Sequence, residues 1–420
     1  MRIINIQHKP RNKYVFLLVV FMFFLLTPAY LKEIEGIKFF LLIGKLLTIL
    51  CGIIFFVLNL RKRSNLFTIE IEVFLYFAFL FFITFILNGD VEKVLKSFIS
   101  SISAVSIICF IGSKSIYSVI YGLLIFFEIL IYGNFISTYF YPSGLYIFRA
   151  DSGWWSQLAW FLGLRNGMTP FYIIGSFLEL IYYEINKKLC RVIVFFVTCL
   201  FTICLINKAS LELTNTSSGG LIIIWLLIVF YFVIKKYKNL FKFVDFKTVF
   251  FLNVFIAVSL ILFDIQQLFS YLLEELLHKS SNLSSRTEIW NYALDFFISS
   301  PIWGNGVEFG ADMAHKLRHA GASDTTQNGY LDILYFGGLI SFILFLLIIF
   351  TVIKNIKKNH IDNSLKFLIS YFSFIYFMSG QMESLVGTRF FIFLSIITVI
   401  TAQSIQKTKD QIKRKTLKND

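Results

Sequence analysis

Long apolar runs separated by short polar segments divide this chain from one end to the other. A run of roughly 17 to 25 apolar residues is long enough to cross a bilayer as a helix. Hydrophobic residues make up 57% of the chain and charged residues only 15%, which is typical of a polytopic membrane protein and incompatible with a soluble globular domain. About twelve transmembrane helices are predicted, near 14–31, 37–60, 66–87, 94–111, 116–140, 168–183, 192–207, 219–234, 249–269, 330–353, 365–379 and 390–403. The expected fold is an all-α polytopic membrane protein, with residues 1–420 as one integral membrane domain.

The distribution of lysine and arginine predicts the orientation of these helices. With the N-terminus inside, 26 of the 39 lysines and arginines fall in the segments on the cytoplasmic side, as the positive-inside rule expects. Both termini are therefore predicted to be cytoplasmic. The net charge of +14 is spread over short clusters and forms no continuous basic face, so nucleic acid is not an expected partner. The first apolar run lacks a small-residue cleavage site and is expected to remain as the first helix.

This orientation places three polar loops on the outer side, at 141–167, 208–218 and 264–329. The last is a large extracytoplasmic loop between helices nine and ten. It begins with an amphipathic segment, 264–279, that is expected to lie on the membrane surface. Arginines are disfavoured in translocated loops, so several of them together suggest an anionic ligand. The outer side carries Arg149, Arg165, Arg286 and Arg318.

A helix start in the large outer loop carries one of these arginines. Ser285 and Glu288 form an S-x-x-E capping box, which puts Arg286 at the first helical position and Trp290 one turn later on the same face. A helix N-terminus favours anions, and a guanidinium adds a fork suited to phosphate oxygens. The pattern predicts a diphosphate-binding site at Arg286. The alternative is that Arg286 pairs with a surface carboxylate or reaches water along its aliphatic stem.

Three ionisable residues, Lys45, Glu128 and Glu179, lie near the middle of predicted spans. An unpaired charge in lipid is costly, so each is a functional candidate. The alternative is a structural ion pair, such as Lys45 with Glu128.

The sequence contains no pattern for a metal or a cofactor. It has no Walker loop, no GxGxxG after a strand and no HExxH. Three histidines share the outer loop, at 278, 315 and 319, but without the spacing of paired ligands. The five cysteines lie in or beside apolar runs without metal or redox spacing. Neither a metal, a cofactor nor a disulfide is expected.

Three short motifs in the large outer loop resemble the signature of the O-antigen ligase and polymerase superfamily. R-T-E-I-W starts at Arg286, S-P-I-W-G-N-G covers 300–306, and Q-N-G-Y-L-D-I-L-Y-F-G-G covers 327–338. The family pattern is roughly R-x-x-x-W, then P-x-x-G-x-G, then H-N-x-Y-L-x-I-L. The twelve-helix layout and the R-A-D-S-G-W-W and R-N-G segments before the sixth helix are also similar.

The resemblance implies that the chain transfers glycans carried on undecaprenyl diphosphate, at the outer face of the bacterial cytoplasmic (inner) membrane. A polymerase adds a growing chain to the next repeat unit of an O-antigen, capsule or exopolysaccharide, whereas a ligase passes the finished chain to lipid A core or protein. Gln327 stands where the ligase histidine would be, and glutamine cannot act as a base. The stretch 216–219 also lacks the ligase arginine. Both departures favour a polymerase.

The resemblance also implies roles for individual residues. Arg286 would hold the leaving diphosphate, and the candidate bases, which the sequence leaves open, are His319, Asp324 and Glu288. The side chains expected to bind substrate are Arg149, Arg165, Arg318, Trp290, Gln327, Asn328 and Tyr330. The expected partners are the undecaprenyl-diphosphate-linked oligosaccharide, the lipid bilayer, a chain-length regulator and a flippase.

A lipid-linked oligosaccharide flippase is the competing interpretation, because such transporters are also twelve-span, basic proteins of the inner membrane. It predicts an internal repeat and charged residues concentrated inside helices. This chain has no clear repeat, and its charges of interest gather in one outer loop.

Overall fold

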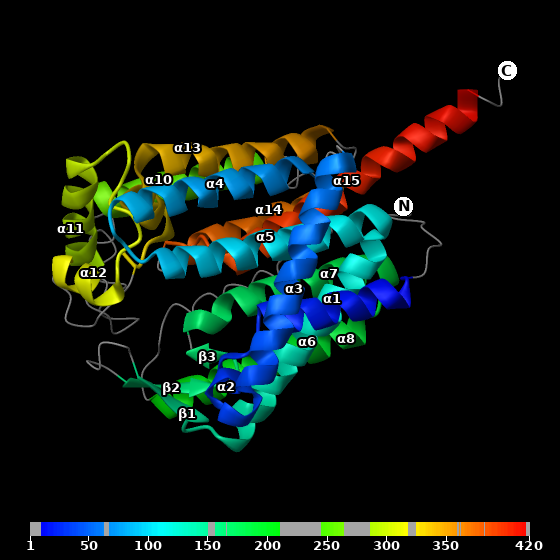
Figure 1. The fold of residues 1–420 in the computed structure, drawn as a ribbon. Helices are drawn as coiled ribbons and strands as arrows, with labels where there is room; N and C mark the ends of the chain where they lie inside the picture. The colour runs from blue at the N-terminus through cyan, green and yellow to red at the C-terminus, as the bar shows by residue number, and fades with distance from the viewer. Residues whose placement is uncertain are drawn as a thin grey trace.

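The computed structural model is a bundle of long helices with one small sheet (Figure 1). It describes residues 10–62, 67–149, 156–164, 166–210, 245–263, 286–317, 325–358, 361, 363–381 and 383–416. The helices are α1 (Asn12–Leu25), α2 (Ala29–Glu33), α3 (Glu35–Lys62), α4 (Phe67–Ile86), α5 (Val91–Lys114), α6 (Ile116–Phe140), α7 (Thr169–Asn186), α8 (Leu189–Ser210), α10 (Phe246–Leu262), α11 (Arg286–Ser299), α12 (Gly310–Lys316), α13 (Gly329–Lys358), α14 (Asn363–Ser379) and α15 (Thr388–Thr416).

Several of these helices match the predicted membrane spans in length and composition. In the described part of the chain, α3, α4, α5, α6, α8 and α13 each contain a stretch long and apolar enough to cross a membrane. Shorter apolar helices are α1, α10 and the first part of α15. The chain is thus an all-α, multi-pass membrane protein, and the count of twelve spans stays a prediction. The predicted helix 219–234, the amphipathic segment 264–279 and Ser285 lie outside the described residues.

The first apolar run is shorter as a helix than the sequence predicts. The run was expected to continue to residue 31, but α1 ends at Leu25 and a second short helix, α2, follows Pro28. The α conformation is disfavoured for a residue that precedes proline, so the helix stops at this point. Thr27 Oγ1 donates to the carbonyl oxygens of Phe23 (3.0 Å) and Phe24 (3.2 Å), which satisfies acceptors left by the break.

The loop 141–167, which is predicted to lie on the outer side, contains a small antiparallel sheet that the sequence did not predict. Its strands, in the order β1-β2-β3, are β1 (Tyr146–Arg149), β2 (Ser156–Trp160) and β3 (Gly163–Leu164). Hydrogen bonds fix it to α6 and to the residue that follows this helix. Trp160 Nε1 donates to the Tyr141 carbonyl at 3.0 Å, and the Leu162 N–H donates to Asn134 Oδ1 at 3.0 Å. Strands this short carry too few residues for an alternating apolar pattern to be recognised.

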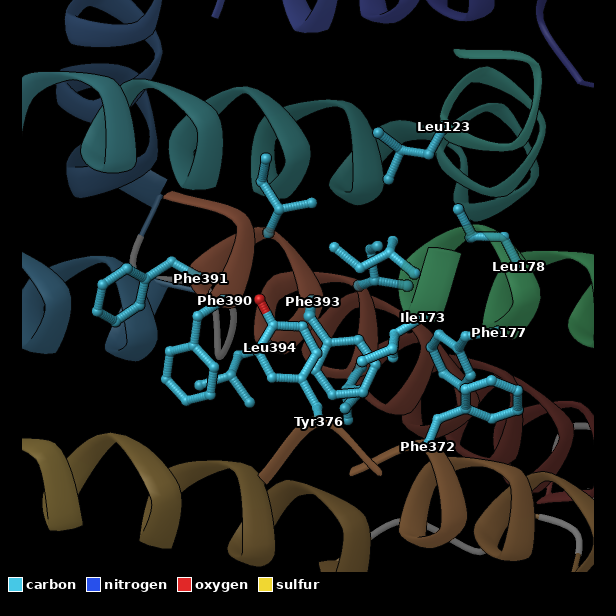
Figure 2. Packing of buried hydrophobic residues seen from close by; sticks show 14 of the residues in the cluster. Leu123, Ile173, Phe177, Leu178, Phe372, Tyr376, Phe390, Phe391, Phe393 and Leu394 are labelled. Carbon is cyan, nitrogen blue, oxygen red and sulfur yellow. The ribbon is translucent and has the colours of Figure 1, made fainter. Parts of the chain in front are cut away.

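The last two helices are locked together by aromatic packing. Tyr376 of α14 stacks on Phe393 of α15 with ring centroids 5.0 Å apart, and Phe177 of α7 meets Phe393 edge to face at 5.3 Å. Figure 2 shows these rings in one layer with residues of α6 and α7. Aromatic pairs contribute about 0.5–1.5 kcal/mol each beyond the area they bury. This packing fixes the turn between α14 and α15, which forms part of the site described below.

The ionisable residues near the middle of the predicted spans pair differently from the prediction. The pairing of Lys45 with Glu128 is wrong: Glu128 accepts two bonds from Arg191, from Nη2 at 2.5 Å and from Nε at 3.2 Å. Glu179 Oε1 lies 3.5 Å from the same Nε. Lys45 belongs to α3, which packs mainly on α5, whereas Glu128 belongs to α6, which packs on α1 and α7 and also on α8, the helix that carries Arg191. The partner of a charged residue is thus determined by which helices lie next to its own helix, and not by how deep the residue lies in the span.

Candidate functional site

The segment that leads into α13 forms a closed turn held by its own side chains. Asn328 Oδ1 accepts from the backbone N–H groups of Tyr330 (3.0 Å) and Leu331 (3.2 Å), as expected of an asparagine that caps a helix. Thr326 donates its N–H (2.7 Å) and its hydroxyl (2.9 Å) to Asp332 Oδ1. The T-Q-N-G-Y-L-D sequence therefore encodes a rigid helix entry.

The first turn of α11 packs on this segment through its two predicted residues. Arg286 Nε donates to Gln327 Oε1 at 2.9 Å, and Trp290 Nε1 donates to the Thr326 carbonyl at 3.1 Å. Gln327 adopts a left-handed backbone conformation, with φ of 55°. Arg286 and Trp290 lie one turn apart in α11 and both contact the helix entry, so the prediction that they share a face is confirmed, while the predicted capping residue Ser285 lies outside the described residues.

The turn between α14 and α15 forms a third part of the site. The Gly329 N–H donates to the Gly380 carbonyl at 2.7 Å, and Asn328 Nδ2 donates to the Gln381 carbonyl at 3.2 Å. Gln381 Nε2 in turn donates to the Asn253 carbonyl of α10 at 2.9 Å. Three regions far apart in the sequence thus meet at one end of the bundle.

Glu383 of this turn is the acidic neighbour of Arg286 that the sequence analysis missed. Its Oε1 lies 3.8 Å from Arg286 Nη2, with the glutamate side chain 35% exposed and the arginine side chain 14% exposed. Burial lowers the pKa of the Arg286 guanidinium and the Glu383 carboxylate opposes this shift, but an arginine remains a cation at any physiological pH. The site therefore joins a mostly buried permanent cation to a partly exposed carboxylate. The signal available in the sequence was the polar interval 380–389 between the last two apolar runs.

Arg389 is a further arginine that the sequence analysis did not single out. It lies in the first turn of α15, six residues after Glu383. Its Nη1 donates to the Gly167 carbonyl at 2.5 Å, and its guanidinium lies 4.9 Å from the centroid of the Phe171 ring. Arg389 thereby ties Gly167, at the end of the 141–167 loop, to the first turn of α15, so the end of this loop lies beside the site.

The remaining predicted residues divide into four groups. Trp290 and Asn328 are fully buried and Tyr330 is 4% exposed, so these side chains support the site and present almost no surface to a ligand. Glu288 is exposed on the first turn of α11. Arg149 ends β1, where its backbone pairs with Ser156, and its side chain is not described. The residues outside the described part of the chain are Arg165, Arg318, His319 and Asp324.

Gly329 provides a test of how tightly the site is assembled. A Cβ at this position would overlap the side chain and backbone of Leu385, so we expect Gly329→Ala to separate the helix entry from the α14–α15 turn. Overpacking of this kind costs about 1–3 kcal/mol. The measurement is thermal unfolding of the purified protein in detergent. The control is Gly36→Ala, where a Cβ has open space, and equal unfolding temperatures for the two variants would contradict the expectation.

Comparison with known proteins bears directly on this region. Residues 200–346 match the family model described as O-antigen ligase, a range that includes Arg286, Gln327 and the first half of α13. No curated protein and no solved structure matches the chain. The family resemblance of the outer-loop motifs is thereby confirmed.

Proposed function

Because residues 200–346 match the family model described as O-antigen ligase, we propose that this chain is a polysaccharide polymerase of the O-antigen ligase and polymerase superfamily. It transfers a glycan chain from undecaprenyl diphosphate onto the next lipid-linked repeat unit. The observation that carries this proposal is the position of Arg286, a mostly buried cation at a helix start, held by Gln327 and within 3.8 Å of Glu383.

The chemistry that such a site can support is displacement of a diphosphate. The anomeric carbon of the donor sugar is bonded to a diphosphate oxygen, and negative charge grows on that oxygen as the bond breaks. A cation already oriented by Gln327 stabilises this charge without reorganisation. The N-terminus of α11 adds backbone N–H groups, whose partial positive charge also attracts the leaving diphosphate. Neither a metal nor a nucleotide takes part in the proposed step.

Glu383 is the proposed general base. Its carboxylate accepts the proton of the acceptor hydroxyl, the hydroxyl oxygen bonds to the anomeric carbon, and the electron pair of the broken C–O bond leaves with the diphosphate. A general base must lie within hydrogen-bond reach of the proton that it removes. Glu383 lies 3.8 Å from the arginine proposed to bind the leaving group, so an acceptor hydroxyl bound next to the donor sugar would be close to its carboxylate. His319, Asp324 and Glu288 stay predictions for the same role.

The choice of polymerase over ligase depends on Gln327. The family signature has a histidine at this position, and here a glutamine accepts a hydrogen bond from Arg286. The side chain orients the arginine and cannot remove a proton. A ligase that passes finished chains to lipid A core or protein is the second candidate, and a lipid-linked oligosaccharide flippase the third.

The proposed setting is the bacterial inner membrane, with twelve spans, both termini cytoplasmic and the site outside. In Figure 1, α11 and α12 lie at one end of the bundle, while α1 begins and α15 ends at the other. This arrangement supports termini on the side opposite the site. A flippase that delivers the lipid-linked repeat unit and a chain-length regulator are the proposed partners.

The test is reconstitution of the purified protein in liposomes with undecaprenyl-diphosphate-linked repeat units as the sole glycan substrate. We expect a ladder of lipid-linked products that grow by whole repeat units. Addition of lipid A core distinguishes the second candidate, because a ligase transfers glycan to it and builds no ladder. Movement of the substrate across the bilayer without a new covalent product would indicate the third.

A further inference from the structure

A polar pocket lies at the same end of the bundle as Arg286, between the α4–α5 turn and the segment 300–316. Its volume is about 490 Å3, which is within the usual range of ligand pockets. Leu87, Asn88 and Gly89 form one wall. The opposite wall belongs to α12 and to the loop before it. None of the residues given a catalytic or substrate-binding role above lines it.

The walls of this pocket are held in place by backbone hydrogen bonds between distant parts of the chain. The Asp90 N–H donates to the Val307 carbonyl at 2.7 Å, and the Val307 N–H donates to Thr84 Oγ1 at 3.0 Å. The Asn305 N–H donates to the Tyr335 carbonyl of α13 at 2.8 Å. The pocket is therefore formed before any ligand enters, which lowers the entropic cost of binding.

The side chains that line the pocket suit a ligand with many hydroxyl groups. Asn88, Asp312 and His315 are exposed, and in the described part of the chain the side chains of Asp312 and His315 make no hydrogen bond or ion pair. Glu308 is already paired, with Lys316 and with the Tyr335 hydroxyl at 3.2 Å. Asp312 thus leaves the lining with a net negative charge, which disfavours a phosphate and permits a neutral or basic sugar.

The pocket also offers apolar surface. Phe309 is 51% exposed and Leu87 is 47% exposed, and both line the pocket. Amide, carboxylate and imidazole groups bind sugar hydroxyls, while an aromatic face packs against the C–H face of a sugar ring. Both kinds of contact are available within one cavity.

The position of the pocket relates it to Arg286. Helix α11 starts at Arg286 and has 14 residues, so it is about 20 Å long, and it ends one residue before Ser300, which lines the pocket. A glycan whose first sugar is at Arg286 could run along α11 and place a later sugar in the pocket. We propose that this pocket binds a saccharide unit of the glycan chain remote from the diphosphate, an assignment that rests on the proposed function.

The test is a titration of repeat-unit oligosaccharide, released from its lipid carrier, into the purified full-length protein by calorimetry. The variant is Asp312→Ala combined with His315→Ala. Both residues are exposed, so we expect the fold to stay intact. We expect binding to weaken about tenfold or more, given the usual strength of hydrogen bonds to charged and neutral groups. Asp295→Ala, an exposed residue of α11 outside the pocket, is the matched control and should bind as the native protein does.

A chain-length assay in cells separates this inference from the proposed function. The double variant should still add repeat units but give shorter chains. A glycan chain that is bound in the pocket dissociates less often between additions, and the variant lacks this contact. Native affinity together with native chain length in the double variant would overturn the assignment. If the native protein makes no polymer but binds the released oligosaccharide through Asp312 and His315, then the proposed function is wrong and the assignment of the pocket as a saccharide site is upheld.

Discussion

Replacing Arg286 by alanine is expected to abolish long glycan chains while leaving the protein in the membrane. The guanidinium is the mostly buried cation of the site, held by Gln327. Loss of one positioned group that stabilises a leaving anion lowers rates about 10²–10³-fold. The measurement is the ladder of lipid-linked products formed by the purified variant, alongside chain length in cells with membrane expression checked.

Arg286→Lys separates the geometry of this residue from its charge. Lysine keeps the charge but lacks the Nε donor that Gln327 accepts from and the fork that binds two phosphate oxygens. We expect it to restore little of the lost rate. Asp295→Ala serves as a control on the same helix, because Asp295 is exposed on α11 and has no proposed role in the transfer. A full product ladder from Arg286→Ala would rule out the proposed role.

Replacing Glu383 by glutamine is expected to slow transfer about 10²–10⁴-fold, the usual contribution of a general base. Glutamine has nearly the same shape and can still accept a bond from Arg286, so the arginine should keep its position. The measurement is the initial rate of repeat-unit addition by the reconstituted protein. Glu383→Asp, which keeps a carboxylate on a shorter stem, should retain more of the rate than the amide does.

The pH profile distinguishes a base from a side chain that only orients Arg286. A carboxylate is an effective base above its pKa, so the native rate should fall as the pH drops through that value. The residual rate of Glu383→Gln should lack this acidic limb. A variant with the native rate and the native pH profile would show that Glu383 is dispensable, and the base would then be sought among His319, Asp324 and Glu288.

Local patterns in the sequence were enough to predict many of the helices and one part of the site, the face of α11 that carries Arg286 and Trp290. Apolar runs predicted α3 and α13 within a few residues, and the arginine-to-tryptophan spacing placed Arg286 and Trp290 on one face of α11. These features act within one helix, because the period of the helix and the thickness of the bilayer determine them. The family signature identified the loop through the same contiguous residues.

The tertiary structure alone decided which distant segments meet. Glu383 reaches Arg286 because aromatic packing fixes the α14–α15 turn beside the helix entry, and Glu128 pairs with Arg191 because α6 packs against α8. The pocket at Asp312 likewise requires the α4–α5 turn and the loop before α12 to come together. Each apolar run gains a similar free energy by packing against any other run. The sequence of a single span therefore does not indicate which helix it packs against. That choice depends on the shapes of whole helix faces.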